Sequence, residues 1–306
     1  MHQPSAICLA VIALLAAAPS GCGSSSAPPA AAGLGILTLP DPGPAGPNAR
    51  PPLREGSGQS LATSFAASGT EQGAEQRGAA EQSCPSGMIH VVGEFCPDVR
   101  QHCRRWLDPP GSRYADYRCA EYARSECAGA RRHADYCIDR DEYAPAGSDL
   151  PASEQSWTDA NATCARLGKR LCLQSEWEFA CEGEEMRPYP YGYTRDSTAC
   201  NADLTDIYEQ GGARIKDLRA KHGAHPACTS PFGVRDLSGN LEEFVSIDGS
   251  SPPRPALMGA WWQPSRNHCR ARQTAHNRYY KGRETGFRCC ADAGTAGALP
   301  PSAEPL

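Results

Sequence analysis

The sequence lacks the features of several protein classes. Aromatic residues make up only 7% of the 306 residues, and the formal net charge is −5, so the composition does not indicate nucleic-acid binding. The apolar run from Ile7 to Ala18 is too short to cross a membrane as a helix of the mature protein. Paired CxxC sets are absent, which argues against a metal-rich cytosolic protein.

Cysteine, in contrast, is abundant. The chain has 16 cysteines, and apart from Cys8 and Cys22 they all lie between Cys84 and Cys290 at irregular spacing. An even number at irregular spacing predicts up to seven disulfides and an oxidising compartment. The 30 glycines and 27 prolines favour loops over long regular elements. We therefore expect a loop-rich α+β domain that carries multiple disulfides.

The N-terminus indicates export. The apolar run is followed by Pro-Ser-Gly-Cys, ending at Cys22, and this resembles a bacterial lipoprotein signal. No Lys or Arg precedes the run, and Pro19 replaces the usual aliphatic residue, so an ordinary cleaved signal peptide is the alternative. We expect residues 1–22 to be the signal and Cys22 to carry a lipid. The protein would then be anchored to a membrane, in the periplasm or on the outer surface of a bacterial cell.

Two further segments have the composition of disordered chain. Residues 23–82 are rich in Ala, Gly, Pro, Ser, Glu and Gln and have almost no aromatic residue. Such a segment cannot bury enough apolar surface to offset its conformational entropy. We expect it to be a linker that holds a domain at residues 83–293 away from the membrane. Residues 294–306 have the same character and are expected to form a loose tail.

Regular elements are few within the expected domain. Strands are predicted over Met88–Val92, with a turn at Gly93, and over Cys137–Tyr143. Between them, Cys96–Tyr136 has little apolar periodicity, so disulfides must take the place of a core there. We interpret this stretch as an insertion.

Two helices follow. The first begins at Ser156–Thr158, with Thr158 or Ser156 as its cap, and ends at Gly168, with Ala160, Cys164 and Leu167 on one face. The sequence KRLC then predicts a short strand or a turn. A second helix begins at Gln174 or Ser175 and ends at Gly183.

Five stretches in a fixed order carry a family resemblance. They are SWTDANATCARLGKRLCLQSEWEFACEG, PYPYGY, CNADLTD, FGVRDLSGNLEEF, and the segment that opens with GAWWQPS and closes with GFRCC. Together they resemble the formylglycine-generating enzyme (sulfatase-modifying factor) family over about residues 84–291. The resemblance implies an irregular, loop-rich α+β fold related to C-type lectins. It also implies oxidation of a cysteine in a client sulfatase to formylglycine.

The catalytic pattern of that family is altered in this sequence. Family enzymes bind copper with two cysteines placed shortly after a Gly-Gly-Ser motif, because Cu(I) prefers soft sulfur ligands. Aligned on Gly259, the two positions fall at Gln263 and His268, and Cys269 lies one residue beyond. We expect Cys269 to form a structural disulfide with Cys289 or Cys290. Copper is therefore not expected as a cofactor, and whether the domain is an enzyme is left open.

The family's calcium-binding pattern is better matched. The resemblance implies ligands at Asp236, at the backbone carbonyls of Gly239 and Leu241, and at Glu243, since calcium prefers oxygen ligands. Asn201 corresponds to a ligand of a second family site. The alternative is a turn followed by a solvated Glu242–Glu243 pair.

The C-terminal stretch is strongly basic. Between Gly259 and Cys290 seven positive side chains stand against one acid, Glu284; they are Arg266, Arg270, Arg272, Arg278, Lys281, Arg283 and Arg288. They could bind an anionic ligand such as a glycan, a phosphate or an acidic peptide. Alternatively, they pair internally with the acids around Asp236 and Glu242. We expect a binding surface at Trp261, Trp262, Arg270 and Arg272.

Two functions compete. The first is an exported, membrane-tethered binding or scaffold module that has lost the oxidase cysteines and whose ligand is a protein, peptide or glycan. The second is an active formylglycine-generating or related oxidoreductase acting on a protein cysteine. A count of free thiols discriminates between them, because copper oxidation needs a reactive thiol pair.

Overall fold

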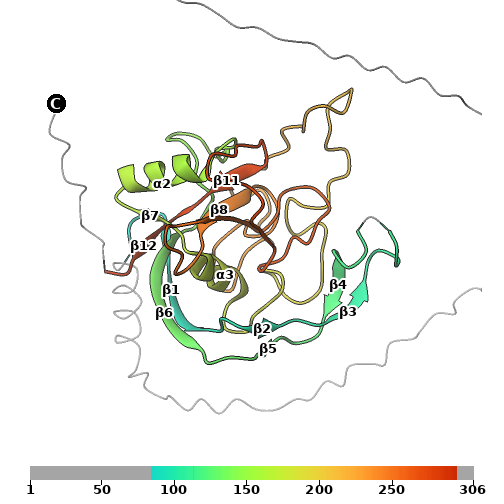
Figure 1. The fold of residues 1–306 in the computed structure, drawn as a ribbon, viewed down its shortest axis with the longest axis horizontal. Helices are drawn as coiled ribbons and strands as arrows, with labels where there is room; N and C mark the ends of the chain where they lie inside the picture. Colours follow the sequence, from blue (N-terminus) through green and yellow to red (C-terminus); the bar gives the residue numbers. More distant parts are fainter. Residues whose placement is uncertain (1–83, 113, 295–306) are drawn as a thin grey trace, which may run out of the picture. The chain divides into compact units, whose positions relative to one another are not determined.

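The computed structural model describes residues 84–112 and 114–294 (Figure 1). The expected signal at 1–22, the linker at 23–82 and the tail beyond residue 294 lie outside the described residues. Within them, strands outnumber helices and long loops connect both, so the predicted loop-rich α+β class is confirmed. None of the described helices is long and apolar enough to cross a membrane.

The first sheet contains four strands in the order β1-β6-β12-β7, and all neighbours are antiparallel. Their bounds are β1 Met88–Phe95, β6 Arg132–Asp139, β12 Cys289–Asp292 and β7 Arg170–Leu171. The turn predicted at Gly93 was wrong, because Gly93 continues β1 and pairs with Ala134. A Cβ at Gly93 would lie 2.7 Å from Glu184 Oε1, so the glycine permits a close approach within a strand. The second predicted strand was placed too late along the chain.

The second sheet has the order β10-β9-β8-β11. Its strands are β8 Glu242–Ser246, β9 Pro255–Met258, β10 Arg272–Gln273 and β11 Thr285–Phe287. Strand β11 is parallel to β8, whereas the other pairs are antiparallel. The basic C-terminal stretch therefore supplies an edge strand of this sheet, β10, and its opposite edge, β11.

Helix α2, Trp157–Arg166, begins where the sequence predicts. Ser156 caps it, and a capping box joins Ser156 and Asp159. Helix α3, Gln174–Glu182, starts at the predicted residue and ends before Gly183, whose φ of 65° lies in the left-handed region.

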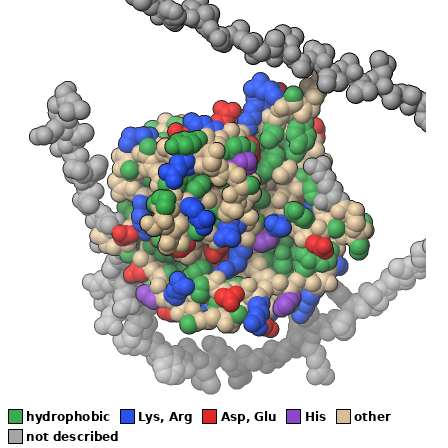
Figure 2. All heavy atoms as spheres, viewed as in Figure 1, with side chains coloured by type: hydrophobic (Ala, Val, Ile, Leu, Met, Phe, Trp, Pro, Cys, Tyr) green, Lys and Arg blue, Asp and Glu red, His purple; other side chains and the backbone are tan. Residues whose placement is uncertain are grey.

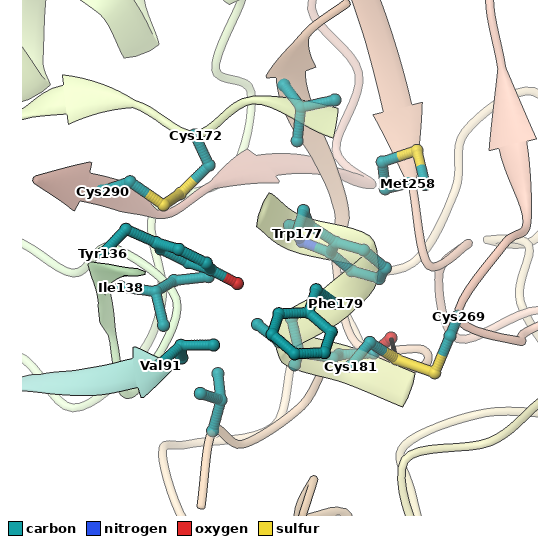
Figure 3. Packing of buried hydrophobic residues seen from close by; sticks show 14 of the residues in the cluster. Val91, Tyr136, Ile138, Cys172, Trp177, Phe179, Cys181, Met258, Cys269 and Cys290 are labelled. Atoms are coloured by element: carbon teal, nitrogen blue, oxygen red, sulfur yellow. Dashed lines mark hydrogen bonds between the residues drawn. A yellow bond between two sulfur atoms is a disulfide. The ribbon is translucent and has the colours of Figure 1, made fainter. Parts of the chain in front are cut away.

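The main core lies between α3 and the two sheets (Figure 3). Trp177 and Phe179 of α3 pack there with Val91, Ile138 and Met258. Two disulfides, Cys172–Cys290 and Cys181–Cys269, are part of the same cluster. Because all these groups are almost completely buried, the disulfides here reinforce a hydrophobic core.

The insertion is built differently. It forms two-stranded ribbons that continue from β1 and β6 (Figure 1). The first pairs β2, Val99–Arg100, with β5, Glu126–Cys127, and the second pairs β3, Cys103–Trp106, with β4, Cys119–Tyr122. The disulfides Cys96–Cys127 and Cys103–Cys119 each close one ribbon, as expected for a stretch without apolar periodicity.

Candidate functional site

Every cysteine from Cys84 to Cys290 is in a disulfide, as the sequence predicts. The seven bonds are Cys84–Cys137, Cys96–Cys127, Cys103–Cys119, Cys164–Cys289, Cys172–Cys290, Cys181–Cys269 and Cys200–Cys228. The partner predicted for Cys269 was wrong. It bonds Cys181 of α3, whereas Cys289 and Cys290 bond residues in and after α2.

Gln263 and His268, the residues expected at the family's two cysteine positions, differ in their surroundings. Gln263 lines a cleft of about 240 Å³ together with Tyr117, Trp261 and Arg266. His268 lines a neighbouring cleft of about 260 Å³, together with Tyr122 of the insertion. The insertion thus forms part of the wall of both clefts.

A cation–π contact separates the two clefts. The Arg266 guanidinium lies 4.6 Å from the centre of the Tyr117 ring, and both residues line both clefts. Trp106 lines the His268 cleft together with Tyr117 and is 41% exposed. A ligand in either cleft would therefore contact residues of both the insertion and the basic C-terminal stretch.

His268 is neutral at physiological pH. Burial and the positive charges of Arg266, Arg195 and Arg270 lower its pKa to about 3. Its Nδ1 accepts a hydrogen bond from the backbone N–H of Arg270 at 3.2 Å, so the proton of the neutral ring belongs on Nε2. His268 in this state offers a ligand a hydrogen-bond donor.

Glu242 is a cleft residue that the sequence reading missed as a site. It lines the Gln263 cleft and is 9% exposed, so the solvated Glu242–Glu243 pair considered as an alternative was wrong. Burial raises the pKa of Glu242 to about 8, and the nearby charge of Glu284 adds to the shift. At neutral pH the carboxyl is therefore mostly protonated and can donate a hydrogen bond.

Glu243 is engaged in a buried ion pair. The Arg288 guanidinium donates to both of its oxygens, at 2.6 and 2.7 Å, and Trp177 Nε1 donates to one at 2.9 Å. Arg288 and Glu243 are both 0% exposed. A calcium ion at this position would have to compete with a guanidinium for the carboxylate.

The other residues expected to bind calcium lie in the preceding loop. Asp236 is buried, and burial raises its pKa to about 7 although Arg288 opposes the shift. Gly239 packs so tightly that a Cβ would lie 2.4 Å from the backbone oxygen of Asn201. The Asn201 side chain donates to Asn240 Oδ1 at 2.9 Å and to Leu218 O at 2.8 Å. The loop thus brings Asn201 together with the Asp236–Glu243 segment through hydrogen bonds.

These contacts do not form a ready cation site. Both Glu243 oxygens accept hydrogen bonds, and Asp236, whose pKa burial raises to about 7, is only about half ionised at pH 7. Among the described residues, no group of three or more His, Cys, Asp or Glu side chains is arranged to hold a metal ion. The calcium set of Asp236, Gly239, Leu241 and Glu243 stays a prediction.

The basic residues of the C-terminal stretch divide into two groups. Four are paired with carboxylates within 2.8 Å: Arg270 with Glu182, Lys281 with Asp159, Arg283 with Glu209, and Arg288 with Glu243. Only the last pair lies in the Asp236–Glu243 region, so the internal pairing is more widely spread than expected. Arg266, Arg272 and Arg278 form no carboxylate ion pair with any described residue.

The predicted binding surface needs correction at two residues. Trp262 is 0% exposed, packed with Leu241 and Ile207, and so cannot contact a ligand. Arg270 is held by Glu182 and also donates to the backbone oxygen of Cys96 at 2.6 Å, which ties α3 to the start of the insertion. Trp261 and Arg272 line the Gln263 cleft and remain candidates.

The fold is that of a disulfide-rich α+β domain, and its two small clefts are lined by residues of the insertion and of the basic C-terminal stretch. Residues 99–293 match the family model described as "Sulfatase-modifying factor enzyme 1-like domain". The chain therefore belongs to the sulfatase-modifying factor family. Its fold is the irregular, loop-rich fold of that family, which is related to C-type lectins.

The names of similar proteins indicate different activities. Inactive C-alpha-formylglycine-generating enzyme 2 of Bos taurus is 32% identical over 163 residues, which cover 48% of this chain and 52% of that protein. Hercynine oxygenase of Mycobacterium tuberculosis is 33% identical over 112 residues, covering 35% and 23%. The chain spans about half the length, or less, of the curated relatives it matches.

Solved structures with a similar fold cover most of the domain. CarF aligns with a TM-score of 0.45 and 15% identity, covering 68% of this chain and 98% of that chain. PvdO from Pseudomonas aeruginosa aligns with a TM-score of 0.42 and 15% identity, covering 67% and 94%.

Proposed function

We propose that the domain is a binding module of an exported, membrane-tethered protein and that it does not carry out the copper oxidation of its family. The observation that carries this proposal is the state of the cysteines. Gln263 stands at the first family position, and Cys269, the nearest cysteine to the second, is fully buried in a bond to Cys181. The described residues contain no free thiol for copper or for a client cysteine.

The chemistry of the replacements supports this proposal. Cu(I) selects soft sulfur ligands, whereas the Gln263 side chain offers an amide. His268 has a neutral ring that could ligate a metal, but its Nδ1 already accepts a hydrogen bond from the backbone of Arg270. One imidazole next to an amide does not reproduce a pair of thiolates. A relative named as an inactive C-alpha-formylglycine-generating enzyme is similar over 48% of this chain.

The clefts retain groups suited to binding. Arg266 supplies a positive charge, the protonated Glu242 a donor, and Trp261 and Tyr117 aromatic surface. Small numbers of polar groups among aromatic side chains are typical of ligand sites. We therefore place the primary ligand of this module in the Gln263 cleft, against the insertion.

The proposal also includes export of the protein and its attachment to a membrane. The seven disulfides indicate an extracellular or otherwise oxidising compartment. We propose that Cys22 is acylated and that residues 23–82 hold the domain away from the membrane surface. Mass spectrometry of the N-terminal peptide of the membrane fraction tests this, with Cys22→Ser as control. An unmodified N-terminus, or a variant that stays in the membrane fraction, contradicts the anchor.

An aldehyde assay tests the loss of oxidase activity. The oxidised domain is incubated with copper, oxygen, a thiol reductant and a sulfatase-type cysteine peptide, and formylglycine is sought by mass spectrometry. We expect no aldehyde above the copper-only background. Turnover that disappears in the Cys181→Ser/Cys269→Ser double variant would support the alternative, an oxidoreductase that uses this disulfide.

A further inference from the structure

A third cleft lies beside the Gln263 cleft and is larger, at about 490 Å³. Arg254, Arg272 and Arg278 line it, together with Thr274 and Asn277. Arg272 also lines the Gln263 cleft, so the two clefts share a wall. Three guanidinium groups, a hydroxyl and an amide therefore converge on one open depression.

The arginines of this cleft are not neutralised by ion pairs. Among the described residues none of the three forms a salt bridge with a carboxylate. Arg278 donates to the backbone oxygen of Pro253 at 3.2 Å, with its guanidinium 5.2 Å from the Trp157 ring, and Arg272 donates to an uncharged amide at 3.1 Å. The exposed Arg254 side chain makes no hydrogen bond or ion pair within the described part of the chain. Most of their hydrogen-bonding capacity therefore remains for a ligand.

Two acids, Asp248 and Glu178, lie near the arginines of the cleft, and neither forms an ion pair with Arg254, Arg272 or Arg278. Asp248 accepts from the backbone N–H and hydroxyl of Ser175 at 2.9 and 2.6 Å. The pKa of Glu178 is raised by burial, while Arg270 and, more weakly, Arg272 lower it. Glu178 pairs with Arg270 at 3.5 Å, so Arg272 is not its ion-pair partner.

The rest of the lining discriminates between classes of anionic ligand. Apart from its aromatic rings, only Ile247 and Pro255 offer apolar side chains, which is little for the side chains of a peptide. Tyr279 is 70% exposed, and its ring can lie against the face of a sugar. The His276 ring is stacked on Tyr280 at 3.5 Å between centres, which fixes its orientation as a further polar group.

We propose that this cleft binds an acidic oligosaccharide, with sulfate or carboxylate groups paired to Arg254, Arg272 and Arg278 and a sugar ring against Tyr279. Planar guanidinium groups match both anions in bidentate geometry. The assignment rests on the proposed function, because it gives the binding module a second ligand site, which shares Arg272 with the Gln263 cleft. On the face shown in Figure 2, basic and acidic side chains are interspersed, so that face is not uniformly basic.

Calorimetric titration of the disulfide-bonded domain tests the proposal. The probes are a heparin-derived hexasaccharide, a hexagalacturonate, an uncharged maltohexaose and a hexaglutamate peptide. We expect one or both acidic sugars to bind, with affinity that falls as salt is raised. Arg254→Gln and Arg278→Gln should each weaken binding about tenfold, as expected for loss of one charge-assisted hydrogen-bonded contact. The matched controls Arg100→Gln and Arg132→Gln remove equal charge outside the cleft and should change affinity less than twofold.

Each other result overturns the proposal. Absence of binding to both acidic sugars at low salt, or equal loss in the control variants, removes the site. Equal binding of maltohexaose shows that the anions are not recognised. Tighter binding of hexaglutamate, lost in the same two variants, assigns the cleft to acidic peptides instead. None of these results bears on the aldehyde assay, so failure of the ligand assignment and of the proposed oxidase loss are distinguishable.

Discussion

The insertion and the main core are both cross-linked, but the disulfides have different roles in the two regions. In the insertion, Cys103–Cys119 and Cys96–Cys127 span only 16 and 31 residues and close narrow ribbons. In the core, Cys172–Cys290 and Cys181–Cys269 span 118 and 88 residues and pack among buried side chains. The insertion combines covalent closure with one small cluster, in which Cys119 and Tyr122 pack against Tyr189, whereas the core has a larger buried cluster and a buried ion pair.

The two regions meet at the small clefts. Tyr117 of the insertion lines both of them, and Arg270 connects α3 to the backbone at Cys96. The insertion is thereby held against Gln263 and His268, the positions at which we expect family enzymes to carry their cysteines. The rigid core supplies Gln263 and Glu242, and the insertion supplies the opposing wall.

The largest expected effect comes from breaking the core ion pair. Arg288→Met leaves the fully buried Glu243 charged and without its partner, which typically costs about 3–5 kcal/mol. Chemical denaturation under non-reducing conditions, monitored by tryptophan fluorescence, measures the loss. The double variant Arg288→Met/Glu243→Leu should recover part of it, since the unpaired charge is gone. A single variant as stable as the wild type would show that the pair contributes nothing to the core.

Removing one disulfide from each region tests the comparison directly. Cys172→Ala/Cys290→Ala opens a loop of more than a hundred residues and leaves a cavity, so we expect a loss of about 4–5 kcal/mol. Cys103→Ala/Cys119→Ala opens a short loop and should cost about 3 kcal/mol or less.

The site of unfolding should also differ between the two variants. Hydrogen exchange should rise throughout the domain when the core bond is removed, but only around β3 and β4 when the ribbon bond is removed. Domain-wide exchange in the ribbon variant would mean that the insertion is part of the cooperative core.

Glu242, at the border of the two regions, predicts a pH effect. Its folded-state pKa of about 8 lies above the usual value near 4.5, so between these values the folded domain binds more protons than the unfolded chain. The stabilising contribution is therefore full below about pH 4.5 and is lost as the pH rises through 8. Urea denaturation at pH 5 to 8 should show a smaller decline in Glu242→Gln than in the wild type. Parallel curves for the two proteins would show that Glu242 titrates normally.

The sequence was sufficient for features that depend on local patterns. Ser156 and Thr158 were the candidate caps of α2, and Ser156 is the one observed; the even number of cysteines predicts complete pairing. The partner of Cys269 was not predictable, because Cys181 is 88 residues away and only the packing of α3 brings the two together. Likewise, the adjacent residues Glu242 and Glu243 look like a solvated pair until the β8 strand and Arg288 bury them.

The smallest expected effect concerns calcium. The positive charge of Arg288 already neutralises Glu243, so Asp236 is the one carboxylate of the predicted calcium set without a positive partner. Burial raises the pKa of Asp236 to about 7, so this carboxyl must lose its proton before it binds calcium. Calcium sites whose protein ligands carry little negative charge are weak, so we expect a dissociation constant for calcium of about 10⁻⁴ to 10⁻³ M. Thermal unfolding at pH 8 should then show a melting temperature a few degrees higher in millimolar calcium than in chelator, since a ligand at about ten times its dissociation constant adds roughly 1.4 kcal/mol. Asp236→Asn keeps the shape of the side chain and should remove the difference. An equal shift in the wild type and in Asp236→Asn would place the ion elsewhere, and no shift at all would leave the loop as a hydrogen-bonded turn whose acids serve the core ion pair.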